Sequence, residues 1–234
     1  MTKKKIFVVA LAVCLLAILS MSSLAWFSAK DSVKNEFYVA DSTVTDPDDV
    51  FSVDVYEYTE NSPTNKVPAG ETYKDILPGD LLKKEPHVAN TGYYDQYIRV
   101  IITMSDAANW KAILGNEFGE AAILGLFDGL DQTMWNHITV ETLDASDEIR
   151  IVMYYNGILD GTDAGDETAD ITVFNNVKIP GAMDQEDAVN FGADGFTIDV
   201  KAQAVQTENV VPDGTAAEDA AWAAFDTVKM ALDA

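Results

Sequence analysis

The chain has 234 residues, of which 39 are acidic and 15 basic, and its formal net charge is −24. A charge of this sign and size disfavours nucleic acid and anionic membrane surfaces as partners. The one cysteine, Cys14, lies inside an apolar run near the start, so we expect no disulfide to hold the fold.

The first 25 residues are typical of a secretory signal peptide. Lys3, Lys4 and Lys5 precede an apolar run over residues 6–19, and small residues at Ser23 and Ala25 suit a signal peptidase. We therefore expect cleavage between Ala25 and Trp26. The apolar run is short for a membrane span of about 20 residues, and an uncleaved signal, the alternative, would be the only link to the membrane.

Cleavage would remove three lysines and no acidic residue, so the net charge of −24 would become −27 over the 209 residues that remain. Residues 41–234 are predicted to form a single domain. Short segments rich in β-branched and aromatic residues alternate there with clusters of Gly, Pro, Asn and Asp; the segments are 51–60, 96–104, 137–143, 148–159, 171–180 and 196–206. This pattern predicts a mainly β protein, a jelly-roll-like β-sandwich.

Two segments have helical rather than strand spacing. Residues 105–130 are rich in Ala and Leu and predict a helical insertion. The C-terminal segment predicts a helix, with a capping box of Thr215 and Glu218 and with Trp222, Phe225, Lys229 and Leu232 on one stripe. A helix packed on the sandwich is the simpler interpretation, and a partner-binding helix is the alternative.

Residues 26–40 alternate like a β-strand directly after the expected cleavage site. One face of this strand is largely apolar: Phe27, Ala29, Val33, Phe37 and Val39. A strand must pair with another strand to satisfy its backbone groups. It can be the first strand of its own sheet, or it can add to the sheet of a neighbouring molecule, and a head-to-tail contact of the second kind generates an open filament.

Several stretches resemble one known family. The Lys-rich signal runs into "LAWFSAKDSVKNEF", and "ILPGDLLKKEPHVANTGYYDQYIRV" joins a Pro-Gly-Asp turn to an Asn-Thr-Gly turn and an Arg-bearing strand. The stretches "YYNGIL", "TVFNNVKIP" and "IDVKAQAVQ" extend the similarity over most of the chain, residues 105–130 excepted. In these features the chain resembles the TasA/camelysin family of secreted Gram-positive proteins.

This resemblance implies a jelly-roll subunit of biofilm matrix or cell-surface fibres. It implies export through a SipW-type signal peptidase, head-to-tail polymerisation with other copies of the chain through a donor strand, and an accessory fibre subunit. A monomeric extracellular adhesin or binding module of the same fold is the alternative, with the N-terminal strand in its own sheet.

The camelysin name also raises a third interpretation, a metalloendopeptidase. Zinc proteases place two histidines one helical turn apart with a glutamate between them. The two histidines here, His87 and His137, have no such spacing, and no Gly-x-Ser-x-Gly elbow occurs. We therefore expect a protein that is not an enzyme.

Calcium is the one cofactor that the sequence raises. A Gly-containing stretch carries five acidic side chains, Asp160, Asp163, Asp166, Glu167 and Asp170, whose oxygens suit calcium although their spacing differs from an EF-hand. A solvated acidic loop is the alternative. Tyrosines flank two turns and can stack on sugars in a binding module: Tyr93, Tyr94, Tyr97, Tyr154 and Tyr155.

Overall fold

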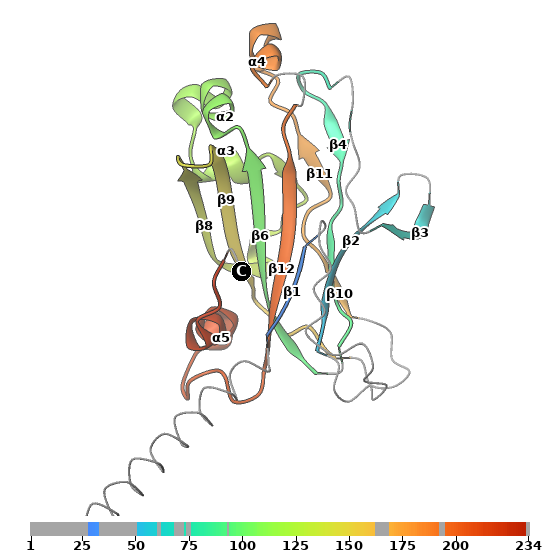
Figure 1. The fold of residues 1–234 in the computed structure, drawn as a ribbon, viewed down its shortest axis with the longest axis vertical. Coiled ribbons are helices and arrows are strands. Elements are labelled where there is room, and N and C mark those ends of the chain that lie inside the picture. The colour runs from blue at the N-terminus through green and yellow to red at the C-terminus, as the bar shows by residue number, and fades with distance from the viewer. Residues whose placement is uncertain are drawn as a thin grey trace, which may run out of the picture.

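The structure is a computed structural model, and it describes residues 28–32, 51–59, 62–67, 73, 76–92, 94–161, 169–191 and 195–232. The expected signal peptide and its cleavage site lie outside these residues. The described chain forms a mainly β sandwich with a helical insertion and a C-terminal helix, which confirms the predicted fold class (Figure 1).

The first layer is a five-stranded antiparallel sheet. Its strand order is β1 (Ser28–Ser32), β12 (Ile198–Gln206), β6 (Gln96–Ser105), β9 (Glu148–Tyr155) and β8 (Trp135–Leu143). β6 lies at the centre, and its alternate residues Ile98, Val100, Ile102 and Met104 are fully buried in the main core. This alternation is what one buried face of a strand requires.

The second layer contains two smaller sheets. One has the order β10 (Asp170–Thr172), β5 (His87–Asn90), β2 (Val53–Thr59) and β3 (Ser62–Val67). The other has the order β4 (Leu81–Lys83), β11 (Asn176–Lys178) and β7 (Phe127–Asp128). The β4–β11 and β5–β10 pairs keep one register, so they form a single antiparallel ribbon that is interrupted at residues 84–86 and 173–175.

That interruption corrects the prediction of one strand over residues 171–180. The chain leaves β10 at Thr172 and enters β11 at Asn176, in a different sheet. Between them Val173 donates its backbone N–H to Pro86, and the buried Phe174 ring packs 4.8 Å from the ring of Phe127. The break thus places an aromatic side chain in the core, where a regular strand would have continued to pair.

The helical insertion lies above the first sheet. It contains α2 (Ala107–Leu114), the 3-10 turn η2 (Gly115–Glu117) and α3 (Glu120–Leu124), followed by η3 (Gln132–Met134). α4 (Gln185–Asn190) lies at the same end. The buried Trp110 holds these parts together, because its ring contacts Phe191 and Phe196 at 5.3 and 4.9 Å. Among the described residues, no helix has the length and apolar character that crossing a bilayer requires.

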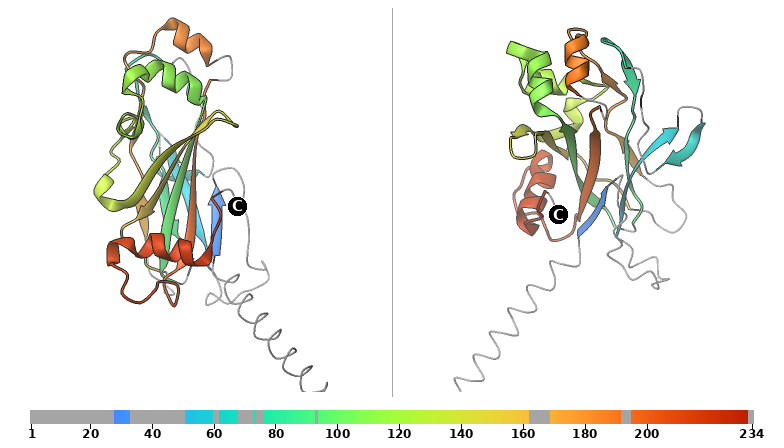
Figure 2. Two further views of the ribbon diagram at one scale, coloured as in Figure 1. Left: turned by 90° about the vertical axis from the view of Figure 1, so that its left-hand side faces the viewer. Right: turned by 45° about the horizontal axis from the view of Figure 1, so that its top comes forward.

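The C-terminal helix lies across the lower part of the outer face of the first sheet (Figure 2). η4 (Ala217–Asp219) leads into α5 (Ala220–Val228). The predicted capping box is wrong: the N-cap residue is Asp219, without a side-chain cap, and the Thr215 hydroxyl instead donates to the Pro212 carbonyl. The predicted stripe is wrong as well, because Phe225 is buried among alanines while Trp222 is exposed.

Candidate functional site

The N-terminal strand β1 lies at one edge of the first sheet. It pairs antiparallel with β12 in a register that sets Ser28 opposite Val205, Ala29 opposite Ala204 and Ser32 opposite Lys201. With five residues, β1 is the shortest strand of its sheet. It lies beside both β12 and β2, at the side of the sandwich where the two layers meet (Figure 1).

β12 is the strand against which β1 pairs. Ala202, Ala204 and Val205, which pair with residues of β1, are fully buried. The ladder between β1 and β12 consists of main-chain hydrogen bonds, which any strand of suitable shape can make. The edge of β12 over Lys201–Val205 thus receives β1 of the same chain through main-chain pairing.

Of the five residues assigned to the donor face, the structure describes only Ala29, which lies in β1. Phe27, Val33, Phe37 and Val39 lie outside the described residues, as do Ala25 and Trp26.

The Pro-Gly-Asp and Asn-Thr-Gly turns, quoted above for the resemblance, each join distant segments of the chain by hydrogen bonds. In the Pro-Gly-Asp turn, Gly79 donates its N–H to the Ile179 carbonyl at 3.2 Å, and Ile179 returns a bond to Asp80 at 2.8 Å. Gly79 has φ +86°, a conformation that favours glycine. The turn thus joins β4 to the segment after β11.

Asn90, at the start of the Asn-Thr-Gly turn, is fully buried and ties three segments together. Its side-chain amide donates to the carbonyls of Leu159 and Asp160 at 2.9 and 3.0 Å, and its backbone N–H donates to Ala169 at 3.0 Å. Asn90 therefore fixes both ends of the acidic segment that the sequence raised as a calcium site.

That segment is only partly described. Asp163, Asp166 and Glu167 lie outside the described residues, and Asp160 and Asp170 flank them. Asp170 already accepts a hydrogen bond from the Tyr56 hydroxyl. Within the ranges that the structure describes, no three His, Cys, Asp or Glu side chains gather as metal ligands would.

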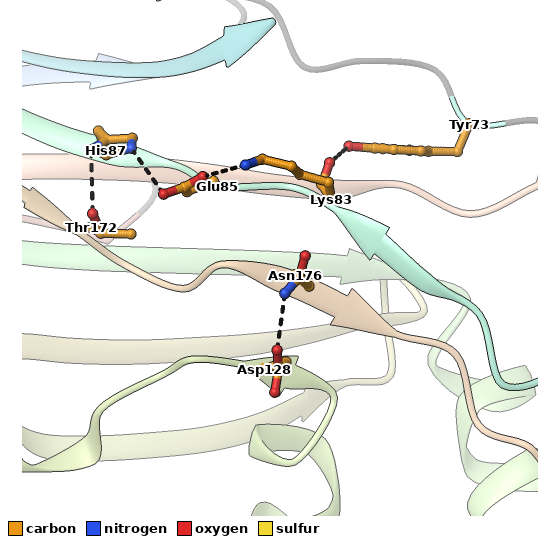
Figure 3. Close-up of polar contacts among 7 residues, drawn as sticks. All are labelled: Tyr73, Lys83, Glu85, His87, Asp128, Thr172 and Asn176. Carbon is orange, nitrogen blue, oxygen red and sulfur yellow. Dashed lines mark hydrogen bonds and ion pairs between the residues drawn. The ribbon is translucent and has the colours of Figure 1, made fainter. Parts of the chain in front are cut away.

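His87 lies in a polar and aromatic cluster on the second layer. Its Nδ1 is 3.4 Å from the Thr172 hydroxyl, and its Nε2 is 3.7 Å from a Glu85 carboxylate oxygen (Figure 3). The Tyr56 ring stacks on the imidazole with 5.2 Å between centroids. Burial, reinforced by the hydrogen bond to Asp170, raises the pKa of Tyr56 above its usual range.

His137 lies in the other layer, on β8. Its Nε2 is 2.8 Å from Asp219, and its ring stacks on Trp222 with 4.8 Å between centroids. Asn136 adds a hydrogen bond to the carbonyl of Glu218 at 2.5 Å. These contacts fasten the start of α5 to the sheet, and they include no residue of the His87 cluster. The structure does not bring the two histidines together.

Sequence reasoning missed Arg99, which fastens the other end of α5. This buried arginine on β6 donates through Nε to Gln203 at 2.8 Å and through Nη2 to the carbonyls of Met230 and Ala231 at 3.0 and 3.2 Å. Burial lowers the pKa of Arg99. An arginine inside an Ile/Val-rich strand was the signal that could have indicated such a role.

The predicted tyrosine site for sugars does not gather as one surface. Tyr94 is exposed, whereas Tyr97, Tyr154 and Tyr155 are half-buried, and Tyr93 lies outside the described residues. Tyr97 and Tyr154 pack against a small apolar cluster beneath α5, formed by Val205, Val210, Ala224 and Phe225.

Comparisons with known proteins add no identification, since protein-family models, curated proteins and solved structures all give no match.

Proposed function

We propose that the chain is a secreted structural subunit, not an enzyme, which polymerises head to tail into fibres of a Gram-positive cell surface or biofilm matrix. In the fibre, β1 leaves the β12 edge of its own chain and pairs with the same edge of the next copy. A SipW-type signal peptidase releases the strand during export, and an accessory subunit joins the fibre.

The single observation that carries this proposal is the placement of β1. A short strand at a sheet edge, directly downstream of the expected cleavage site, pairs through its main chain with β12 and lies beside β2. Exchange of an identical element between copies replaces each contact by an equal one, so it costs little free energy. The resemblance to the TasA/camelysin family supports the same conclusion.

Cleavage would control when exchange starts. While the signal remains attached, the segment before β1 is tied to the membrane and cannot reach another copy. The acidic surface adds a second control, because copies with a net charge near −27 repel one another at low ionic strength. We therefore expect assembly to be faster in added salt.

Electron microscopy of purified residues 26–234, beside a variant that starts at residue 40, tests the proposal. Fibres in the first sample and none in the second are expected. Fibres of normal length without residues 26–39 would exclude strand exchange.

A second candidate is the monomeric extracellular adhesin or binding module. The observation that favours it is the pairing of β1 with its own β12. A mature chain that stays monomeric at every concentration and salt level in sedimentation would select this candidate.

A further inference from the structure

One asparagine of the chain is followed by a glycine, Asn156 in the turn after β9. Its side chain is exposed, and within the described residues it takes part in no hydrogen bond. Four other asparagine side chains are held by hydrogen bonds to their surroundings: Asn90, Asn109, Asn136 and Asn176. The Asn156 amide is therefore free to turn toward its own main chain.

Gly157 leaves the next main-chain nitrogen open to that amide. Glycine has no side chain to obstruct an approach along the chain, and its backbone turns more freely than that of any other residue. The Gly157 N–H donates to no acceptor among the described residues. The Tyr155 ring packs so closely against this glycine that a Cβ added there would lie 2.9 Å from a ring carbon. A larger residue at position 157 would thus displace the ring.

The turn is anchored on both sides of this pair. The Asn156 N–H donates to the Met134 carbonyl at 2.8 Å. Leu159 exchanges two backbone bonds with Gln96 at the start of β6, at 2.9 and 3.0 Å, and its carbonyl accepts the Asn90 amide at 2.9 Å. Only residues 157 and 158 separate these anchors, so the length of main chain between them is fixed.

We propose that Asn156 is a site of spontaneous deamidation. The Gly157 nitrogen gives up its proton to solvent base and forms a bond to the side-chain carbonyl carbon of Asn156. The bond from that carbon to the amide nitrogen breaks, and the nitrogen takes a proton from water and leaves as ammonia. A five-membered cyclic imide remains, in which the side chain of residue 156 is joined to the main chain.

One water molecule then opens the imide. Attack on the former side-chain carbonyl gives aspartate, and attack on the main-chain carbonyl gives isoaspartate, in which the chain continues through the side chain. Overall the chain takes up one water and releases one ammonia, with no change of oxidation state, and water is the only co-reactant. Either product adds one negative charge to the chain.

The two products differ in what they do to the turn. Aspartate keeps the main chain as it is. Isoaspartate adds one methylene carbon between the Asn156 N–H and the Gly157 nitrogen, so the main chain becomes too long for the space between the Met134 and Gln96 anchors. At least one anchoring bond should then lengthen or break, which weakens the joint between β6 and the segment after β9.

Peptide mapping by mass spectrometry of residues 26–234, incubated in the folded state at mildly alkaline pH, tests the proposal. Asn156 is expected to be the first asparagine converted, several-fold ahead of every other one, with both products present. Asn116→Gln, at an exposed asparagine followed by glutamate, is the control and should leave the rate at residue 156 unchanged. Earlier conversion at another asparagine would overturn the proposal. So would an Asn156 that stays intact in the folded chain after the urea-unfolded chain has converted.

Urea unfolding separates the effects of the two products. Asn156→Asp reproduces aspartate at this position and should keep the native urea midpoint, whereas the purified isoaspartate fraction should unfold at a lower urea concentration. An isoaspartate fraction with the native midpoint would contradict the loss of an anchoring bond. These measurements involve no fibre, so their outcome is independent of the proposed function.

Discussion

The guanidinium carbon of Arg99 lies 4.4 Å from the centre of the Phe225 ring. This pair joins the sheet to α5: the ring covers the charge, and the same guanidinium binds carbonyls beyond the end of the helix. Phe225 belongs to a small apolar cluster with Val205, Val210 and Ala224, separate from the main core. The helix is thus attached to the sandwich without sharing its interior.

Replacement of Phe225 by alanine should therefore release α5 and leave the sandwich folded. Loss of a buried phenylalanine costs about 3–5 kcal/mol, and Phe225 is the largest buried side chain of α5. Limited proteolysis should cut the segment between β12 and α5 much faster than in the native chain, while tryptophan fluorescence in urea keeps the main transition. Asp226→Ala, at an exposed site of the same helix that makes only a surface ion pair with Lys229, is the control and should protect the segment as the native chain does.

The buried ion pair of Lys84 and Glu57 makes a second prediction. Their charged atoms lie 2.6 Å apart, and both side chains are almost fully buried. Lys84→Met leaves a carboxylate buried without its partner and should lower the free energy of unfolding by about 3–5 kcal/mol. The double variant Lys84→Met/Glu57→Leu removes both charges and should recover most of that loss in urea titrations. A double variant less stable than Lys84→Met would show that the pair is not the cause.

The raised pKa of Tyr56 predicts that the folded chain loses stability in alkali. Burial, and then the bond to Asp170, raises the pKa of Tyr56 from its ordinary value of 10.0. The unfolded chain therefore releases this proton first, so the stabilisation is complete below pH 10 and declines as the pH rises above it. Urea midpoints between pH 8 and pH 11 should fall more steeply for the native chain than for Tyr56→Phe. Equal slopes would contradict the prediction, and Tyr94→Phe, at an exposed site, should keep the native slope.

Sequence reasoning predicted the strands and helices whose hydrophobic pattern lies within the element itself. The Ile/Val-rich alternation of β6 and β12 and the Ala/Leu spacing around α2 each identified an element of the right type. The break between β10 and β11 was not predictable, because Phe174 leaves the ladder to reach a core that other segments build.

The candidate site was predictable in part for the same reason. Period-two alternation indicated an N-terminal strand, but the choice of β12 as its partner depends on residues about 170 positions away in the chain. The predicted stripe of α5 was wrong because four alanines and Phe225 form the buried face of the helix, whereas Trp222 stays exposed. Small residues carry a weak hydrophobic signal, although they allow the closest packing.

A reversible lock on β1 tests the central claim most directly. Ala29 and Ala204 are opposite each other in the ladder, and directly paired residues lie at about the Cα separation that a disulfide needs. The Ala29→Cys/Ala204→Cys variant of residues 26–234, oxidised as a dilute monomer, should form no fibres in salt by electron microscopy. Addition of a reductant should restore fibres of native length. Fibres that form equally well from the oxidised, internally locked monomer would contradict strand exchange.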